Sequence, residues 1–259
     1  MILLKKNMTD PAVSRLCELL GIEKKTTFDD QVEVAVKDFQ KNNNLGADGI
    51  VGSKTWLALF TQGKSGNIND SDFAWAGEYL GCEPKAIKAV TIVETAGRGG
   101  FIAPGKPQIL FEGHHFYKYL GKNAPAIAKT YPTICYPSWT KKYYKGGLAE
   151  YSRFELARRI NEDAAIKSIS MGMFQIMGSN YKLCGCSSPL EMWKKACRDQ
   201  VQQFIQGVEF IRNSGLAPYL AKKDWAGFAL RYNGRNFKEN QYDTKLEKAY
   251  KNGSHESLQ

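Results

Sequence analysis

The first 60 residues carry apolar side chains three and four positions apart, which is the pattern of amphipathic helices. Asp10-Pro11 is a typical helix opening and Gly21 a typical end. The pattern predicts three helices: one from Pro11 to Leu20, one from Asp29 or Asp30 through Phe39, and one from Ser53 to Phe60. The glycine-rich segment 45–52 predicts a turn in which Gly49 and Gly52 take unusual backbone angles.

Beyond this region, residues 61–72 are small and polar, with a single apolar residue, as is typical of a flexible linker. Glu83-Pro84 then opens a helix that Gly97 ends. A long amphipathic helix is predicted from Trp193, Cys197, Val201, Phe204, Val208 and Ile211. The predicted fold is mainly α with at most a small β element. We expect a module at 1–62, a linker at 63–72 and a second domain at 73–259.

The chain has 259 residues and a formal net charge of +10. Residues 1–60 are neutral, so the whole excess lies in residues 61–259, where the lysines are scattered. No nucleic-acid-binding motif accompanies this charge, so we expect attraction to an anionic surface and no nucleic-acid partner. The apolar stretches are too short to span a bilayer, and MILLKK lacks the length of a signal peptide. The sequence therefore predicts no signal peptide, no transmembrane segment and no stable membrane insertion.

Six cysteines are present, and without a secretion signal a reducing compartment favours free thiols over disulfides. Cys184, Cys186 and Cys197 are close enough in sequence to suggest metal ligands, but no histidine has zinc-type spacing with them. We therefore expect buried thiols, with no metal and no cofactor.

The candidate for chemistry is Glu94, which lies in the last turn of the helix that begins at Pro84. Ile87, Val90 and Glu94 follow at i, i+3 and i+7, so Glu94 is on the apolar face. Burial and the negative end of the helix dipole would both raise the pKa of its carboxyl. Such a group can act as a general acid, although a salt-bridged glutamate would give the same pattern.

Two further segments add polar groups to apolar surroundings. Gln175 lies within Ser170–Met177, where a buried amide needs partners that sugar hydroxyls could supply. Tyr232 and Asn233 end a helix that starts near Asp224. The alternatives are that Phe174 and its neighbours form core, and that Asn233-Gly234 is an ordinary C-cap.

The N-terminal region resembles the peptidoglycan-binding module of cell-wall hydrolases over about residues 10–60. The resemblance rests on Phe28-Asp-Asp, Val34–Gln40, Leu45, Asp48–Gly52 and Thr55-Trp56 at fixed spacing. It implies a three-helix fold that binds peptidoglycan near Asp48, Gly49, Thr55 and Trp56. Phe39, Leu45 and Trp56 could equally be core residues.

The segment from about 75 to 250 resembles the lysozyme-like superfamily, in its goose-type lysozyme and lytic transglycosylase branch. It is most similar to the N-acetylmuramidase domain of modular phage endolysins, through Val93–Gly97, Phe101, Gly105–Glu112 and His114-His115-Phe116. The resemblance implies that Glu94 is the general acid, that Phe174 and Gln175 line the cleft, and that Tyr232 and Asn233 position Glu94 or the sugar. Gly113 stands where relatives often carry arginine, which puts any contact made there in doubt.

The resemblance further implies cleavage of the β-1,4 bond between MurNAc and GlcNAc in bacterial peptidoglycan. A second carboxylate would stabilise the oxocarbenium-like centre or activate water, and Glu112 is the candidate. Alternatives are Glu150, Glu155, Glu162 and Asp163, while His115 could bind substrate or fix Glu112. A lytic transglycosylase needs only Glu94, and a wall-binding protein needs no catalytic acid. We expect a monomer that stays in the host cytoplasm until a separate membrane-perforating protein gives access to the wall.

Overall fold

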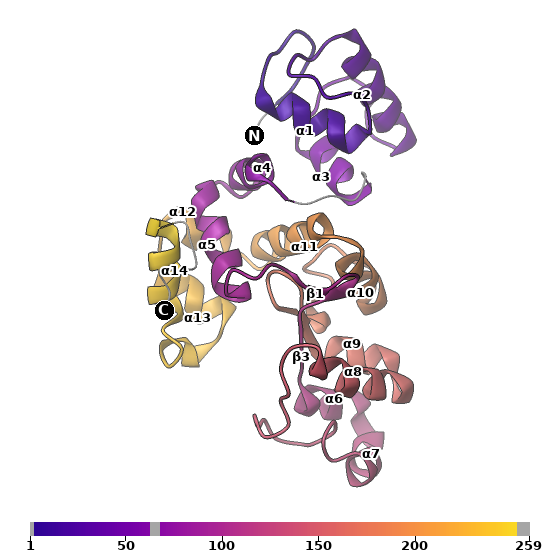
Figure 1. The fold of residues 1–259 in the computed structure, drawn as a ribbon, viewed down its shortest axis with the longest axis vertical. Coiled ribbons are helices and arrows are strands. Elements are labelled where there is room, and N and C mark those ends of the chain that lie inside the picture. Colours follow the sequence, from indigo (N-terminus) through magenta and orange to yellow (C-terminus); the bar gives the residue numbers. More distant parts are fainter. Residues whose placement is uncertain (1–2, 63–67, 253–259) are drawn as a thin grey trace. The chain divides into compact units, whose positions relative to one another are not determined.

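The structure is a computed structural model that describes residues 3–62 and 68–252 (Figure 1). Its chain divides into two compact units, Met1–Ala89 with Leu216–Gly253, and Val90–Gly215. Helices dominate both units and the sheets are small and antiparallel, so the predicted mainly-α fold is confirmed. Along the described residues, no helix combines the length and apolar character needed to cross a membrane.

The first unit is built from helices at both ends of the chain. Its elements are α1 (Pro11–Leu20), α2 (Asp30–Asn42), α3 (Ser53–Gln62), α4 (Asp70–Leu80), the start of α5 (Pro84–Thr95), α12 (Ala217–Ala221), α13 (Trp225–Tyr232), the short 3₁₀ helix η3 (Arg235–Lys238) and α14 (Tyr242–Asn252).

The three helices predicted in the N-terminal module are confirmed, and their caps explain where they begin and end. The Asp10 carboxylate accepts a hydrogen bond from the Ala12 N–H at 2.7 Å, and Gly21 ends α1 in the left-handed region at φ 70°. In the turn before α3, Gly49 has φ 75° as expected, whereas the prediction for Gly52 is wrong because its φ is not positive. The local sequence therefore determines this module well.

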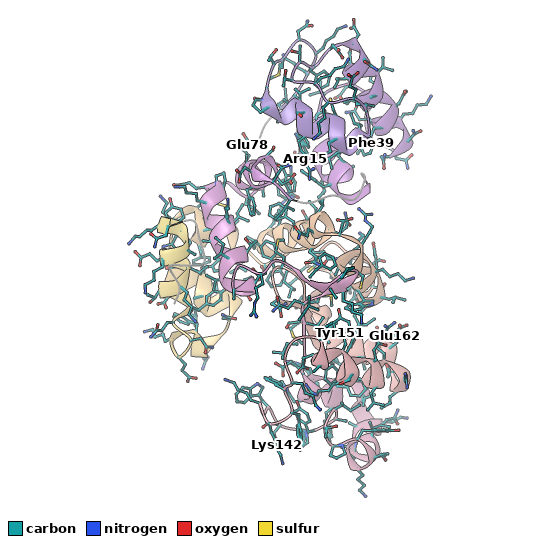
Figure 2. The ribbon with its side chains drawn as sticks, in the orientation of Figure 1. Arg15, Phe39, Glu78, Lys142, Tyr151 and Glu162 are labelled. Carbon is teal, nitrogen blue, oxygen red and sulfur yellow. The ribbon has the colours of Figure 1, made fainter. Side chains whose placement is uncertain are left out.

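The end of the predicted linker differs from expectation. Residues 63–67 lie outside the described residues, but Asp70–Asp72 already belong to α4. Asn69 caps this helix, and Asp72 completes a capping box by accepting the Asn69 N–H at 2.8 Å. The Asp72 side chain is 1% exposed and accepts two hydrogen bonds of 2.9 Å from Arg15 on α1, labelled in Figure 2. A buried ion pair thus joins α1 to α4.

The second unit holds the rest of α5 and both sheets. Its elements are β1 (Phe101–Ala103), β2 (Lys106–Pro107), β3 (Ile109–Phe111), α6 (Gly113–Leu120), η1 (Gly121–Asn123), α7 (Ala124–Thr130), α8 (Ala149–Ile160), α9 (Glu162–Lys167), β4 (Ile169–Met171), β5 (Ile176–Met177), η2 (Gly178–Asn180), α10 (Pro189–Arg198) and α11 (Gln200–Asn213).

The larger sheet has the order β3-β4-β5, with Ile109 opposite Met171 and Phe111 opposite Ile169. This sheet contains the apolar run Ile109–Phe111, which leads directly to Glu112. Its inner side chains are apolar and buried, and α8 packs close to β3. The sheet therefore fixes the direction in which the chain arrives at Glu112.

The single long helix predicted through Trp193 and Ile211 is in fact two helices. The break is at Asp199, whose backbone is extended at φ −166° and ψ 171°. Its carboxylate caps α11 by accepting the Gln202 N–H at 2.8 Å. The apolar spacing continues across the break, which is why periodicity alone did not reveal it.

We expect Asp72→Ala to destabilise the protein strongly, because the buried Arg15 guanidinium would lose the buried carboxylate that accepts two of its hydrogen bonds and would keep only the more exposed Glu18 as an acidic partner. Burial raises the pKa of the Asp72 carboxyl and Arg15 opposes that shift, so the charge depends on this partner. Removing one member of a buried ion pair costs about 3–5 kcal/mol of unfolding free energy. Urea unfolding followed by tryptophan fluorescence measures the loss. Asp70→Ala is the matched control, since the Asp70 side chain is exposed; equal losses in both variants would contradict the expectation.

Candidate active site

Glu94 lies where the sequence predicts, in the last turn of α5. Ile87 and Val90 are fully buried on the same helix, and Glu94 is partly exposed. Ala96 and Gly97 then take left-handed angles, φ 49° and 72°, and turn the chain away. The helix therefore ends one residue after Glu94, which is itself only partly buried.

The segment that follows Glu94 is held against the turn between β4 and β5. The Gln108 N–H donates to the Gly100 carbonyl at 2.8 Å, and the Gly172 N–H donates to the Gln108 carbonyl at 2.8 Å. A Cβ at Gly100 would lie 1.8 Å from Gln203 Oε1 and 3.0 Å from the Met173 nitrogen. Glycine is required at position 100 because there is no room for a side chain.

Gln175 organises this turn through contacts within the protein. Its backbone has φ 44°, and its amide nitrogen donates to the carbonyls of Gln108 at 3.1 Å and Gly172 at 2.9 Å. Its amide oxygen accepts from the Ser170 hydroxyl at 3.0 Å. Both amide hydrogens therefore have protein partners, and the partly exposed Gln175 remains a predicted cleft residue held in one orientation.

Phe174, which was predicted to line the cleft, lies in the core of the second unit, as its alternative interpretation expects. Its side chain is 1% exposed and packs 6.1 Å from the ring of Phe204. It also lies so close to α11 that a Cβ at Gly207 would approach it to 2.1 Å. Its packing in this structure is that of a core residue, and its contact with substrate stays a prediction.

Sequence reasoning missed Gln203, which fixes the same turn from α11. Its buried amide accepts the Met173 N–H at 2.9 Å and donates to the Ala196 carbonyl at 2.9 Å. The available signal was a glutamine among the core-facing positions of an amphipathic helix. Such a group must find hydrogen-bond partners when buried.

Glu112 follows β3 directly and is the N-cap residue of α6, but its side chain makes no capping hydrogen bond to that helix. Its carboxylate is 14% exposed and accepts a 2.6 Å hydrogen bond from the Tyr144 hydroxyl. His114 Nδ1 lies 3.4 Å from the same oxygen. Burial and the contact with Glu112 raise the pKa of Tyr144, so this phenol remains a hydrogen-bond donor. Tyr144 was not anticipated, because it is 32 residues away in the chain.

The backbone on either side of Glu112 is fixed by a buried ion pair on α8. Glu150 is 0% exposed, and one of its oxygens accepts from Arg153 Nη1 at 2.8 Å and from the Phe111 N–H at 3.4 Å. Its other oxygen accepts the N–H groups of Lys145 and Gly146, next to Tyr144. One carboxylate thus holds the residue before Glu112 and the loop that carries Tyr144.

Arg153, the ion-pair partner of Glu150, also holds the backbone next to Glu112. It donates to the Phe111 carbonyl at 3.0 Å and to the Tyr136 hydroxyl at 3.3 Å. That hydroxyl accepts the Gly113 N–H at 3.2 Å, and a Cβ at Gly113 would lie 2.3 Å from the Tyr136 ring. The tyrosine ring therefore explains why glycine stands at position 113.

The other acids considered for the second catalytic carboxylate are engaged elsewhere. Glu150 has no exposed surface, and its oxygens are occupied as described above. Glu155 and Glu162 pair with Arg158, and Asp163 pairs with Lys167 at 2.6 Å. Compared with these acids, Glu112 has a carboxylate that is partly exposed and that accepts its hydrogen bond from an uncharged group, the Tyr144 hydroxyl.

His115 lies on α6 with its ring 4.3 Å from that of His114 and stacked on Tyr119. Its Nδ1 atom is buried without a hydrogen-bond partner among the described residues. Burial, assisted by His114 and Lys118, lowers the pKa of His115 to about 4. His115 is therefore neutral near pH 7, and its predicted contact with substrate remains a prediction.

Tyr232 and Asn233 belong to the first unit, at the end of α13. Asn233 is the exposed C-cap, and its N–H donates to the Ala229 carbonyl at 2.9 Å. The Tyr232 ring stacks on Phe228 at 5.1 Å and on Tyr242 at 6.1 Å. Both residues serve the local fold, and their predicted role toward Glu94 remains a prediction.

In the N-terminal module, the predicted binding segment surrounds a cavity of about 320 Å³ next to Asp48 and Thr55. Buried Gln40, which was not singled out from the sequence, holds this segment in place. Its amide nitrogen lies within hydrogen-bond distance of Asp48, the Ile50 carbonyl and Thr55. Its amide oxygen accepts the Gly49 N–H at 2.9 Å. The Ile50 N–H donates to Asp48 and is the main cause that lowers the pKa of this carboxyl.

Trp56 is 2% exposed, which favours its interpretation as a core residue, and its contact with peptidoglycan stays a prediction. It stacks on Phe60 at 5.8 Å within the core of the module. Asp48 is exposed, whereas Gly49 and Thr55 are buried beside the cavity. The polar groups at its rim therefore remain the candidates for binding.

None of the six cysteines, all in described parts of the chain, forms a disulfide, and four of them are buried. Within residues 3–62 and 68–252, no cluster of three histidine, cysteine, aspartate or glutamate side chains is placed to hold a metal ion.

Comparison with known proteins gives two family matches in the order predicted. Residues 83–254 match the N-acetylmuramidase family, and residues 16–59 match a peptidoglycan binding domain family. The crystal structure of the Burkholderia AP3 phage endolysin is similar, with a TM-score of 0.64 and 30% sequence identity over 96% of this chain and 98% of that one. No curated protein matches the chain.

The chain therefore belongs to the N-acetylmuramidase family, with an N-terminal peptidoglycan-binding domain. It is a glycoside hydrolase, and the resemblance to modular phage endolysins inferred from the sequence is confirmed.

We expect the His115 imidazole to titrate near pH 4, because burial disfavours its charged form. The unfolded chain binds this proton near pH 6.5, so the associated stability is present above pH 6.5 and is lost as the pH falls toward 4. Histidine NMR signals, assigned with His115→Gln, measure the titration, and urea unfolding of both proteins at pH 7 and 4.5 measures the stability. A titration near pH 6.5 would contradict the expectation.

Proposed function

We propose that this protein is an endolysin that hydrolyses the β-1,4 bond between MurNAc and GlcNAc in the peptidoglycan of its host. The observation that carries the proposal is the N-acetylmuramidase match over residues 83–254, within which the partly exposed Glu94 lies in the last turn of α5. The similarity to a phage endolysin along nearly the whole chain supports the lytic role.

In the proposed reaction, Glu94 donates a proton to the glycosidic oxygen as the bond to the anomeric carbon breaks. Glu112 supplies the second carboxylate, which stabilises the positive charge that develops on the sugar or takes a proton from the attacking water. Its hydrogen bond from Tyr144 supports this role, because it holds the carboxylate in one orientation. Water completes the reaction and leaves a reducing MurNAc end.

Gln175 and Glu112 lie at opposite ends of β3, Gln175 beside the residue before the strand and Glu112 directly after it. The Gln175 amide donates to the Gln108 carbonyl, and Glu112 is four positions further along the extended chain, a span of about 13 Å. That length is comparable to a disaccharide unit. We propose that a glycan strand runs along this direction.

The N-terminal module is proposed to hold the enzyme on peptidoglycan through the polar rim of the Asp48–Thr55 cavity. We further propose that the protein acts as a monomer, stays in the host cytoplasm during synthesis, and reaches the wall after a separate protein perforates the inner membrane. The similarity to a phage endolysin supports this sequence of events.

Glu94→Gln should lower the release of reducing ends from purified peptidoglycan by about 10²–10⁴-fold, because an amide cannot donate the proton. Binding to the same peptidoglycan in cosedimentation should be unchanged. Glu162→Gln, at an exposed position at the start of α9, is the matched control and should retain activity. Full activity of Glu94→Gln would exclude Glu94 as the acid.

Glu112→Gln should lower kcat for reducing-end release, by more than Tyr144→Phe does. The tyrosine variant loses one charge-assisted hydrogen bond, which corresponds to about tenfold in rate. Mass spectrometry of the wild-type digest tests the reaction type: reducing-end MurNAc supports hydrolysis, and 1,6-anhydro-MurNAc identifies a lytic transglycosylase. Unchanged activity of Glu112→Gln would remove Glu112 from the mechanism.

A further inference from the structure

A basic cavity of about 490 Å³ lies beside the Glu112–Tyr144 pair in the second unit. Its walls come from two segments of the loop between α7 and α8 and from α8 itself: Thr133, Ile134, Lys142, Tyr143, Tyr144, Lys145, Ser152, Arg153 and Leu156. Three of these residues are cationic, and no acidic residue is among the described residues that line the cavity. The cavity is therefore suited to an anion.

The two lysines are the groups available to such a ligand. The Arg153 guanidinium is buried and donates to the Thr133 and Phe111 carbonyls, to Glu150 and to Tyr136. Its charge is compensated by Glu150. Lys142 and Lys145 are exposed, and Figure 2 shows Lys142 projecting from the loop. The Lys142 ammonium lies 5.4 Å from the centre of the Tyr143 ring, so an aromatic face adjoins the charge.

The cavity and the candidate catalytic carboxylate share Tyr144. This residue lines the cavity, and its hydroxyl donates to Glu112 at 2.6 Å. The adjacent Lys145 and Gly146 are fixed through their backbone N–H groups to buried Glu150. The cations are therefore carried on a loop whose backbone is anchored beside Glu112.

We propose that this cavity binds a free carboxylate of the stem peptide attached to MurNAc when the glycan strand lies at Glu112. The inference rests on the proposed function, because the peptide arrives with the strand. Lys142 and Lys145 attract the carboxylate, and the Tyr143 ring packs against the aliphatic part of the peptide. The site would make the enzyme prefer glycan that carries charged peptides, which is a specificity absent from the cleavage chemistry itself.

The test uses the full-length protein and two forms of the same purified peptidoglycan. One form is native, and in the other the peptide carboxylates are amidated with ammonium chloride and a carbodiimide. The kcat/KM for reducing-end release should be about fivefold higher on the native form, as expected for two exposed ion pairs. In the double variant Lys142→Ala/Lys145→Ala this preference should fall to about one, through a higher KM on the native form.

The matched control is Lys122→Ala/Lys129→Ala, which removes the same charge from exposed positions on η1 and α7 of the same unit. It should keep the preference for native peptidoglycan. Equal loss in both double variants would mean general attraction to an anionic polymer and would overturn the proposal, as would an unchanged preference in Lys142→Ala/Lys145→Ala. If the wild type releases no reducing ends from either form, the proposed hydrolysis itself fails, and the inference fails with it.

Discussion

The buried pair of Glu150 and Arg153 is the interaction on which the candidate second carboxylate depends. A charge with no exposed surface must be compensated and hydrogen-bonded, and these two side chains satisfy that requirement by binding the backbone around Glu112 and Tyr144. Breaking the pair would cost more than an ion pair at the surface, because the remaining charge would be left in the core. The need to satisfy buried charge thus fixes the corner between β3 and α6.

A second fixed point lies at the other end of β3, and it is built from neutral amides. Gln203 holds the Met173 N–H, and Gln175 holds the carbonyls of Gln108 and Gly172. Close backbone approach at Gly100 excludes any larger side chain there. The short strand β3 therefore has a charged anchor at one end and an amide anchor at the other. These two anchors fix both ends of β3 although the sheet itself is small.

The sequence predicts the parts of this architecture that local chemistry determines. Helix caps such as Asp10 and Gly21, and the placement of Glu94 in the last turn of α5, follow from neighbouring residues. Tyr144 and Gln203 could not be found in this way, because their contacts lie 32 and 30 residues away in the chain. The burial of Phe174 likewise depends on a glycine of α11, which only the tertiary fold brings to it.

The ion pair between Arg15 and Asp72 changes how the binding module relates to the rest of the chain. A module followed by a polar linker would be expected to move independently, yet Asp72 anchors α4 to α1 by buried hydrogen bonds. The path from α4 to α5 is also tight, since a Cβ at Gly77 would lie 2.8 Å from the Cys82 carbonyl oxygen. The α5 helix then continues to Glu94. Within the first unit, the buried ion pair and the close approach of Gly77 to the Cys82 carbonyl therefore hold α1, α4 and the start of α5 together, which a flexible linker alone could not do.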